Sequence, residues 1–110
     1  MICKTIFFDV IKRGKIMTLS KVKNVPDTAG LVPPYPYNNM SWLKYWEKRT
    51  GKTASFCSVC GCVNKAEHGG HVKRCDVFWD HGVYIVPLCA ECNNPNNTKE
   101  FYVDCVLCAV

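Results

Sequence analysis

Two closely spaced pairs of cysteines are the residues of this sequence best suited to chemistry. The first pair is Cys57 and Cys60, followed by Gly61, and the second is Cys89 and Cys92. Two C-x2-C pairs supply four thiolates, the tetrahedral ligand set of many structural zinc sites. Each pair would lie on a tight turn, and a glycine supplies the backbone freedom that such a turn needs. The spacing therefore predicts a structural Zn²⁺ ion that joins the two turns.

Three further cysteines bear on which residues would bind the metal. Cys62 is close enough to Cys57 to replace Cys60, which would give a first pair with C-x4-C spacing. Cys105 and Cys108 also have C-x2-C spacing, but residues i and i+3 of a β-strand point to opposite faces. We therefore interpret Cys105 and Cys108 as small apolar core residues; a second metal site or a redox pair is the alternative.

Composition limits the class of protein. The chain has 110 residues, nine cysteines and a net charge of +5. A zinc ion with four thiolates would lower that charge to +3, which is compatible with nucleic acid without requiring it. No stretch is long and apolar enough to cross a bilayer. Many cysteines without an export signal favour metal binding in a reducing, cytoplasmic compartment over a disulfide framework.

The sequence predicts a basic leader over residues 1–24 and a single zinc-binding domain over residues 40–110. The start of the leader has two interpretations. Codons for Arg13 and Gly14 can form a purine-rich ribosome-binding sequence, so translation that begins at Met17 is the alternative to a start at residue 1.

Residues 25–39 are rich in proline and predict an extended linker with polyproline character. Tyr35 and Tyr37 alternate with the prolines. We interpret the segment as a strap packed on the domain surface; the alternative is a peptide that binds a partner protein through these tyrosines.

A short helix is predicted from Ser41, a good N-cap, to Arg49, where Thr50 and Gly51 stop it. Three aromatic side chains fall on one face, and we expect them to pack as core and cap the zinc module. Three lysines with i+4 spacing lie on another face, which is either simply solvated or in contact with phosphates. The aromatic residues are Trp42, Tyr45 and Trp46, and the lysines are Lys44, Lys48 and Lys52.

The segment between the cysteine pairs predicts a β-hairpin. Residues 77–79 and 83–86 read as two short strands, and Asp80, His81 and Gly82 form a turn-forming triplet. A final strand is predicted from Phe101 to Leu107. One helix and these strands predict a small α+β domain.

Three motifs follow one another along this segment: Cys57–Gly61, His71-Val72, and Pro87-Leu88 leading into Cys89–Cys92. In residue type and spacing they resemble the HNH/treble-clef endonuclease family, over about residues 55–95. Short phage and bacterial proteins with Gly-x-His-Val and Tyr-Ile-Val-Pro-Leu-Cys motifs are also similar. The resemblance implies a zinc-stabilised treble clef, a compact zinc-finger fold.

The resemblance also implies candidate catalytic residues. His71 matches the general base that activates water, beside a divalent cation that holds the scissile phosphate. Gly70 stands where the family has a metal-binding aspartate, and Asn93 stands where it has a final histidine. The asparagine that orients the histidine falls near Tyr84. With no carboxylate beside His71, a Mg²⁺ site built from oxygen ligands has little to hold it.

We therefore expect a zinc-stabilised binding module without catalytic activity, whose partner is nucleic acid or a nucleoprotein. One alternative is an active HNH-type endonuclease that uses His71 as general base and binds Mg²⁺. Another is a protein-interaction inhibitor encoded by a phage or mobile element.

Overall fold

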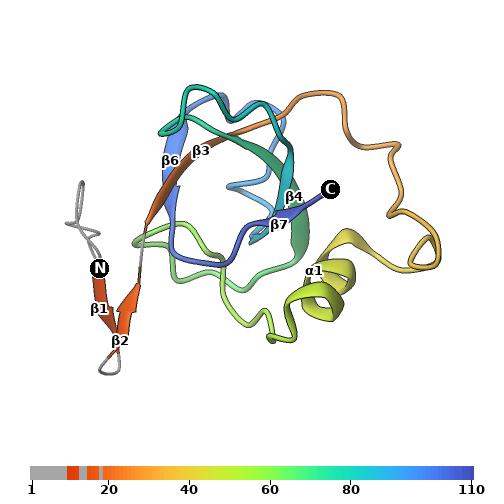
Figure 1. The fold of residues 1–110 in the computed structure, drawn as a ribbon, viewed down its shortest axis with the longest axis horizontal. Coiled ribbons are helices and arrows are strands. Elements are labelled where there is room, and N and C mark those ends of the chain that lie inside the picture. Colours follow the sequence, from red (N-terminus) through yellow and green to blue (C-terminus); the bar gives the residue numbers. More distant parts are fainter. Residues whose placement is uncertain (1–9, 13–14, 18) are drawn as a thin grey trace.

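The described residues form a small α+β fold with one helix and a five-stranded antiparallel sheet (Figure 1). The computed structural model describes residues 10–12, 15–17 and 19–110, so residues 1–9, 13–14 and 18 of the predicted leader lie outside it. Along the sheet the strands follow the order β6-β3-β4-β5-β7. Their bounds are Ser20–Asn24 for β3, His68–Arg74 for β4, Tyr84–Leu88 for β5, Glu100–Val103 for β6 and Cys108–Ala109 for β7.

The predicted leader contributes strands to the fold. A two-stranded hairpin, β1 (Val10–Lys12) and β2 (Lys15–Met17), lies beside the start of β3 (Figure 1). The sequence analysis assigned no element to residues 20–24, yet they form β3, which pairs with both β4 and β6. Val22 is fully buried, and its two neighbours in the sequence, Lys21 and Lys23, are partly exposed. This alternation of apolar and basic side chains is typical of a half-buried strand.

The helix prediction is confirmed. Helix α1 spans Trp42–Thr50, and the Ser41 side chain accepts a hydrogen bond from the Lys44 backbone N–H at 3.1 Å. Gly51 ends the helix with φ of 73°, a left-handed conformation that costs glycine little. Serine at the N-cap and glycine at the C-cap are thus sufficient to place both helix ends.

The hairpin prediction is wrong for its first strand. Residues 77–79 belong to a turn, and the strand that pairs with β5 is the earlier β4, with His71 opposite Ile85. Two adjacent glycines made the stretch around residue 70 a weak strand candidate. The glycine at position 69 has a tertiary role, since a Cβ there would lie 2.6 Å from the Leu43 backbone nitrogen of α1. Glycine therefore lets the helix pack directly on the strand.

Two apolar clusters lie on opposite faces of the sheet, because neighbouring strand residues point in opposite directions. The first holds the fully buried Val86 and Leu88 together with Cys57 and Cys89. The second holds Ile85 together with the aromatic residues of α1. The aromatic face of α1 therefore packs as core, as predicted, but in the second cluster rather than against the cysteines of the first.

The C-terminal segment and the strap differ in how well they match their predictions. Of the strand predicted from Phe101 to Leu107, only residues 101–103 are extended, within β6; residues 104–107 are not strand, and β7 begins beyond the predicted range at Cys108. In the strap, Tyr37 packs edge-on against Tyr45 with ring centroids 5.4 Å apart, whereas Tyr35 is 88% exposed.

No helix among the described residues is both long and apolar enough to cross a membrane.

Candidate functional site

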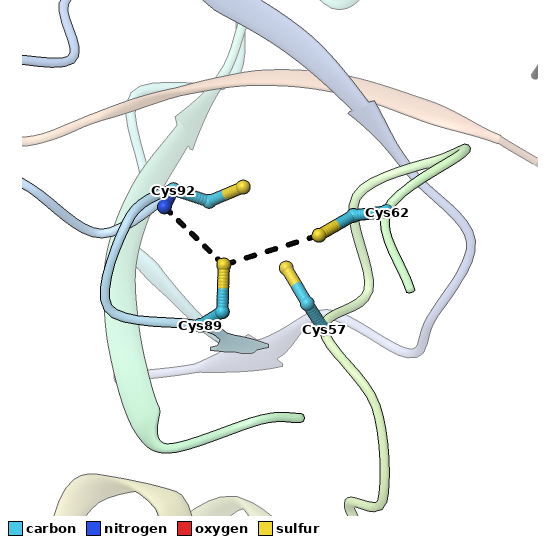
Figure 2. Close-up of side chains that lie close together, drawn as sticks. All are labelled: Cys57, Cys62, Cys89 and Cys92. Carbon is cyan, nitrogen blue, oxygen red and sulfur yellow. Dashed lines mark hydrogen bonds between the residues drawn. The ribbon is translucent and has the colours of Figure 1, made fainter. Parts of the chain in front are cut away.

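Four cysteine side chains converge at one end of the first apolar cluster (Figure 2). Their sulfur atoms all lie within 4.8 Å of one another, and Cys62 Sγ lies 3.9 Å from Cys89 Sγ. A tetrahedral zinc ion with Zn–S bonds of about 2.3 Å holds its sulfurs about 3.8 Å apart. Four thiols with sulfur atoms at nearly this separation could hold a metal ion. Its members are Cys57, Cys62, Cys89 and Cys92.

The first pair in the cluster is Cys57 and Cys62, the C-x4-C alternative, and Cys60 lies outside it. The backbone explains this choice. The Cys62 N–H donates to the Val59 carbonyl at 2.9 Å, and Gly61 has φ of 88°, so the turn brings Cys62 back toward Cys57. The Cys60 N–H instead donates to the Tyr102 carbonyl of β6 at 2.8 Å. Cys60 is disulfide-bonded. The sequence had predicted metal binding by reduced cysteines and no disulfide at this position.

The second pair lies on a tight turn directly after β5. Cys89 Sγ accepts hydrogen bonds from the Cys92 backbone N–H at 3.4 Å and from the Asn64 side-chain amide at 3.6 Å. Burial alone would raise the pKa of Cys89, but these donors hold it at about 7. For Cys57, burial raises the pKa to about 11. The donors around Cys89 are of the kind that orient metal-ligating thiolates.

The pair Cys105 and Cys108 does not join the cluster. Both thiols are free, and burial raises the pKa of Cys105 to about 12. Cys108 is buried in the second apolar cluster, and Cys105 packs against both clusters. Their positions agree with the interpretation of these residues as small apolar core residues.

His71 lies within β4 on the face covered by α1. Its side chain is 6% exposed, and its ring packs edge-on against Trp42 with centroids 4.5 Å apart. Its Nε2 atom is buried without a hydrogen-bond partner among the described residues. His71 thus packs against helix α1. Burial lowers the pKa of His71 below its ordinary value of 6.5.

His71 also lines a polar cleft of about 560 Å³ between residues 25–29 and the loop after the second cysteine turn. Asn24 stands at the cleft with its amide fixed, because Nδ2 donates to the Cys92 and Asn97 carbonyls at 3.0 and 3.2 Å. Its Oδ1 atom is the second buried polar atom without a partner. Other polar residues that line the cleft are Lys23, Asp27, Thr28, Lys73, Asn93, Asn97 and Thr98, so the cleft holds one acidic side chain beside its two lysines.

Lys23 and Lys73 are directly opposite each other on β3 and β4. Neither forms an ion pair within the described part of the chain. Two like charges in directly opposed positions are unfavourable. Glu100 of β6 is opposite Lys23 on its other side and offsets part of this charge, so Lys73 is the lysine of the pair with no acidic residue in the opposed position. The sequence analysis missed both lysines because it assigned no strand to residues 20–24. The alternation around Val22 was the available signal.

Two of the three lysines that were predicted to bind a partner, Lys44 and Lys48, lie on α1, and Lys52 lies just beyond it. Lys44 forms an ion pair with Glu47 at 3.3 Å, while Lys48 and Lys52 are exposed on and just beyond α1. Gly70 is covered by Leu88 and lies against Asn93, because a Cβ at this position would come within 2.7 Å of Asn93 Oδ1. Asn93 and His71 both line the cleft.

The low pKa of His71 predicts a pH dependence of stability. As the pH falls through about 6.5, His71 is protonated in the unfolded chain before it is protonated in the folded one, so the folded state loses stability. We expect the denaturation midpoint to fall more between pH 7.5 and 5.5 in the original protein than in His71→Gln. Urea titrations of both proteins measure it. Equal losses in the two proteins would show that His71 does not contribute.

Comparisons with protein-family models, with curated proteins and with solved structures found no match to this chain.

Proposed function

We propose that the four-cysteine cluster holds a structural zinc ion and that the domain is an HNH-like treble clef used for binding. All-cysteine tetrahedral sites are closed sites, in which every coordination position is taken by protein and no position remains for a substrate. The order of cysteine turn, β4–β5 hairpin and second cysteine turn supports the treble clef. Residues Cys57, Cys62, Cys89 and Cys92 would hold the ion and join the two turns.

The proposed ligand of the module is nucleic acid, bound at the polar cleft. The observation that carries this proposal is the cross-strand pair of Lys23 and Lys73 beside the buried His71. Phosphates would relieve the repulsion between the two ammonium groups, and lysine–phosphate contacts dominate the affinity of nucleic-acid-binding proteins. Both lysines of the cleft lie in paired strands of the sheet, which favours a fixed spacing between the two ammonium groups.

The same geometry favours binding over cleavage. A general base must reach the proton that it removes, but His71 Nε2 is fully buried. Within the described residues, the only group of three or more histidine, cysteine or acidic side chains with metal-binding geometry is the cysteine cluster. An HNH-type endonuclease that uses His71 remains the alternative, and Asn93 beside His71 is the feature in its favour.

Fluorescence anisotropy with labelled DNA at several salt concentrations tests the proposal. Lys23→Gln combined with Lys73→Gln is expected to weaken binding at least ten-fold. The slope of log K against log salt should decrease by about 1.4 to 1.8, because two phosphate contacts are lost. Lys48→Gln combined with Lys52→Gln is the matched control, since it removes two exposed lysines of α1 and its C-terminal flank.

Two outcomes would contradict the proposal. The first is no binding to any DNA at low salt, and the second is an equal loss of affinity in both double variants. Incubation of supercoiled plasmid with Mg²⁺ tests the alternative, since cleavage that depends on His71 would show an endonuclease.

A further inference from the structure

We propose that the protein prefers single-stranded nucleic acid, because the loop over residues 75–83 stacks unpaired bases on Phe78 and Trp79. This loop, named here the aromatic loop, connects β4 to β5. The inference rests on the proposed nucleic-acid binding at the cleft, and it specifies which form of nucleic acid the site takes.

The two aromatic side chains lie open to solvent. Phe78 is 86% exposed and Trp79 is 70% exposed, and their rings meet edge-on with centroids 5.1 Å apart. Large apolar side chains in such positions mark interaction sites more often than isolated exposed residues do. An edge-on pair leaves ring faces free, and any base can stack on a free aromatic face.

The aromatic loop is held in shape by two carboxylates. Asp76 forms two hydrogen bonds with the Arg74 guanidinium, at 3.0 and 3.1 Å. Asp80 accepts from the Gly82 N–H at 2.8 Å and from the Tyr84 hydroxyl at 2.6 Å. Because these bonds order the loop in the free protein, little conformational entropy is lost when a ligand binds to it.

The lysines near the loop favour a polyanion as its partner, since the two carboxylates of the loop, Asp76 and Asp80, already accept hydrogen bonds within it. β4 ends at Arg74, one residue after Lys73, and Lys73 has no ion pair within the described residues. Lys23, its cross-strand neighbour, forms none either, but the β6 residue opposite Lys23 is Glu100, which is paired with Lys21 at 3.0 Å. Unpaired cations next to exposed aromatic rings are the combination that single-strand-binding surfaces use for phosphates and bases.

The cleft and the lysine pair lie along β3 and β4, and the aromatic loop continues the chain from the end of β4. His71 is level with Val25 at the cleft, and Cys75 donates its N–H to the Lys21 carbonyl at the other end of β3. Four residues of strand separate them, or about 13 Å. A short single strand can therefore contact the lysine pair with its phosphates and the aromatic loop with its bases. In a duplex the bases are paired and stacked on one another, so their faces are not available.

The experiment compares affinities for a roughly 12-nucleotide single strand, a length within the site sizes of single-strand-binding domains, and for the same sequence as a duplex. Anisotropy of labelled DNA is the readout. We expect the original protein to bind the single strand at least ten-fold more tightly than the duplex. Phe78→Ala combined with Trp79→Ala should abolish that preference. Tyr35→Ala combined with Phe56→Ala is the matched control, since it removes two exposed aromatic side chains outside the loop.

The outcomes separate this inference from the function on which it rests. Equal affinity for single strand and duplex, or an unchanged preference in the Phe78/Trp79 variant, would overturn single-strand stacking and leave nucleic-acid binding at the lysines intact. The aromatic loop would then be a surface for a protein partner. Absence of binding to both DNA forms would overturn both proposals. Because both aromatic side chains are exposed, the double variant is expected to keep its fold and its metal content.

Discussion

Cys62→Ser is expected to abolish zinc binding and to unfold the domain, whereas Cys60→Ser keeps one zinc ion per chain. Cys62 is in the four-sulfur cluster and Cys60 is not. Structural zinc sites in small domains contribute apparent binding free energies on the order of 10 kcal/mol, comparable with the whole stability of a small domain. Loss of one of the four ligands therefore removes most of the stabilisation that this chain can obtain from metal.

Zinc content by mass spectrometry under native conditions and thermal unfolding by circular dichroism measure this effect. All samples contain a reductant, because Cys60 is disulfide-bonded and Cys60→Ser would otherwise also remove that disulfide. Differences in zinc content then report the loss of a metal ligand alone. Cys75→Ser serves as the control, since Cys75 is a free cysteine outside the cluster. Retention of zinc by Cys62→Ser together with its loss from Cys60→Ser would restore the C-x2-C ligand set.

Gly69→Ala is expected to destabilise the folded protein by about 3 kcal/mol, at the upper end of the usual cost of overpacking. A Cβ at this position would lie 2.6 Å from the Leu43 backbone nitrogen and 2.7 Å from Trp42 Cβ, and it would also contact the Trp42 carbonyl carbon. These are mostly atoms of the helix backbone, which cannot move aside as the end of a side chain can. The substitution must therefore push α1 away from β4.

The denaturant midpoint, measured for both proteins in the same buffer with Zn²⁺, measures this change. Gly30→Ala is the matched control, because no atom lies within 4 Å of its Cβ position and its φ is not left-handed. Its stability should be unchanged or slightly increased, since alanine lowers the entropy of the unfolded chain. A loss below about 0.5 kcal/mol, within the range of neutral surface substitutions, in Gly69→Ala would show that the contact between helix and strand is not as close as described.

Helix α1 was predictable because its signals are local. Ser41 and Gly51 satisfy the free backbone groups at its two ends, and the i, i+3, i+4 spacing of the aromatic residues determines which face is buried. The same holds for the presence of a four-cysteine site, since each pair is separated by only a few residues. The small α+β class follows from these elements.

Other features depended on contacts between distant parts of the chain. β3 is a strand because β4 and β6 pair with its two edges, and the alternation around Val22 is a weak local signal for it in a segment of five residues. Cys60 and Cys62 are equally plausible by spacing, and the hydrogen bond from Cys60 to Tyr102 in β6 decides between them. Residues 77–79 have high β-propensity but lie in a loop, because the carboxylates of Asp76 and Asp80 are satisfied there.

The sequence by itself determined the helix with both of its ends, the ability to form a thiolate metal site, and the general class of the fold. Only the tertiary structure decided which cysteine completes the cluster, that His71 is buried against Trp42, and that Lys23 and Lys73 face each other beside a polar cleft. The physical reason is the separation along the sequence over which each interaction acts. Caps and turns act over a few residues, whereas strand register joins residues fifty positions apart and determines which side chains share a face.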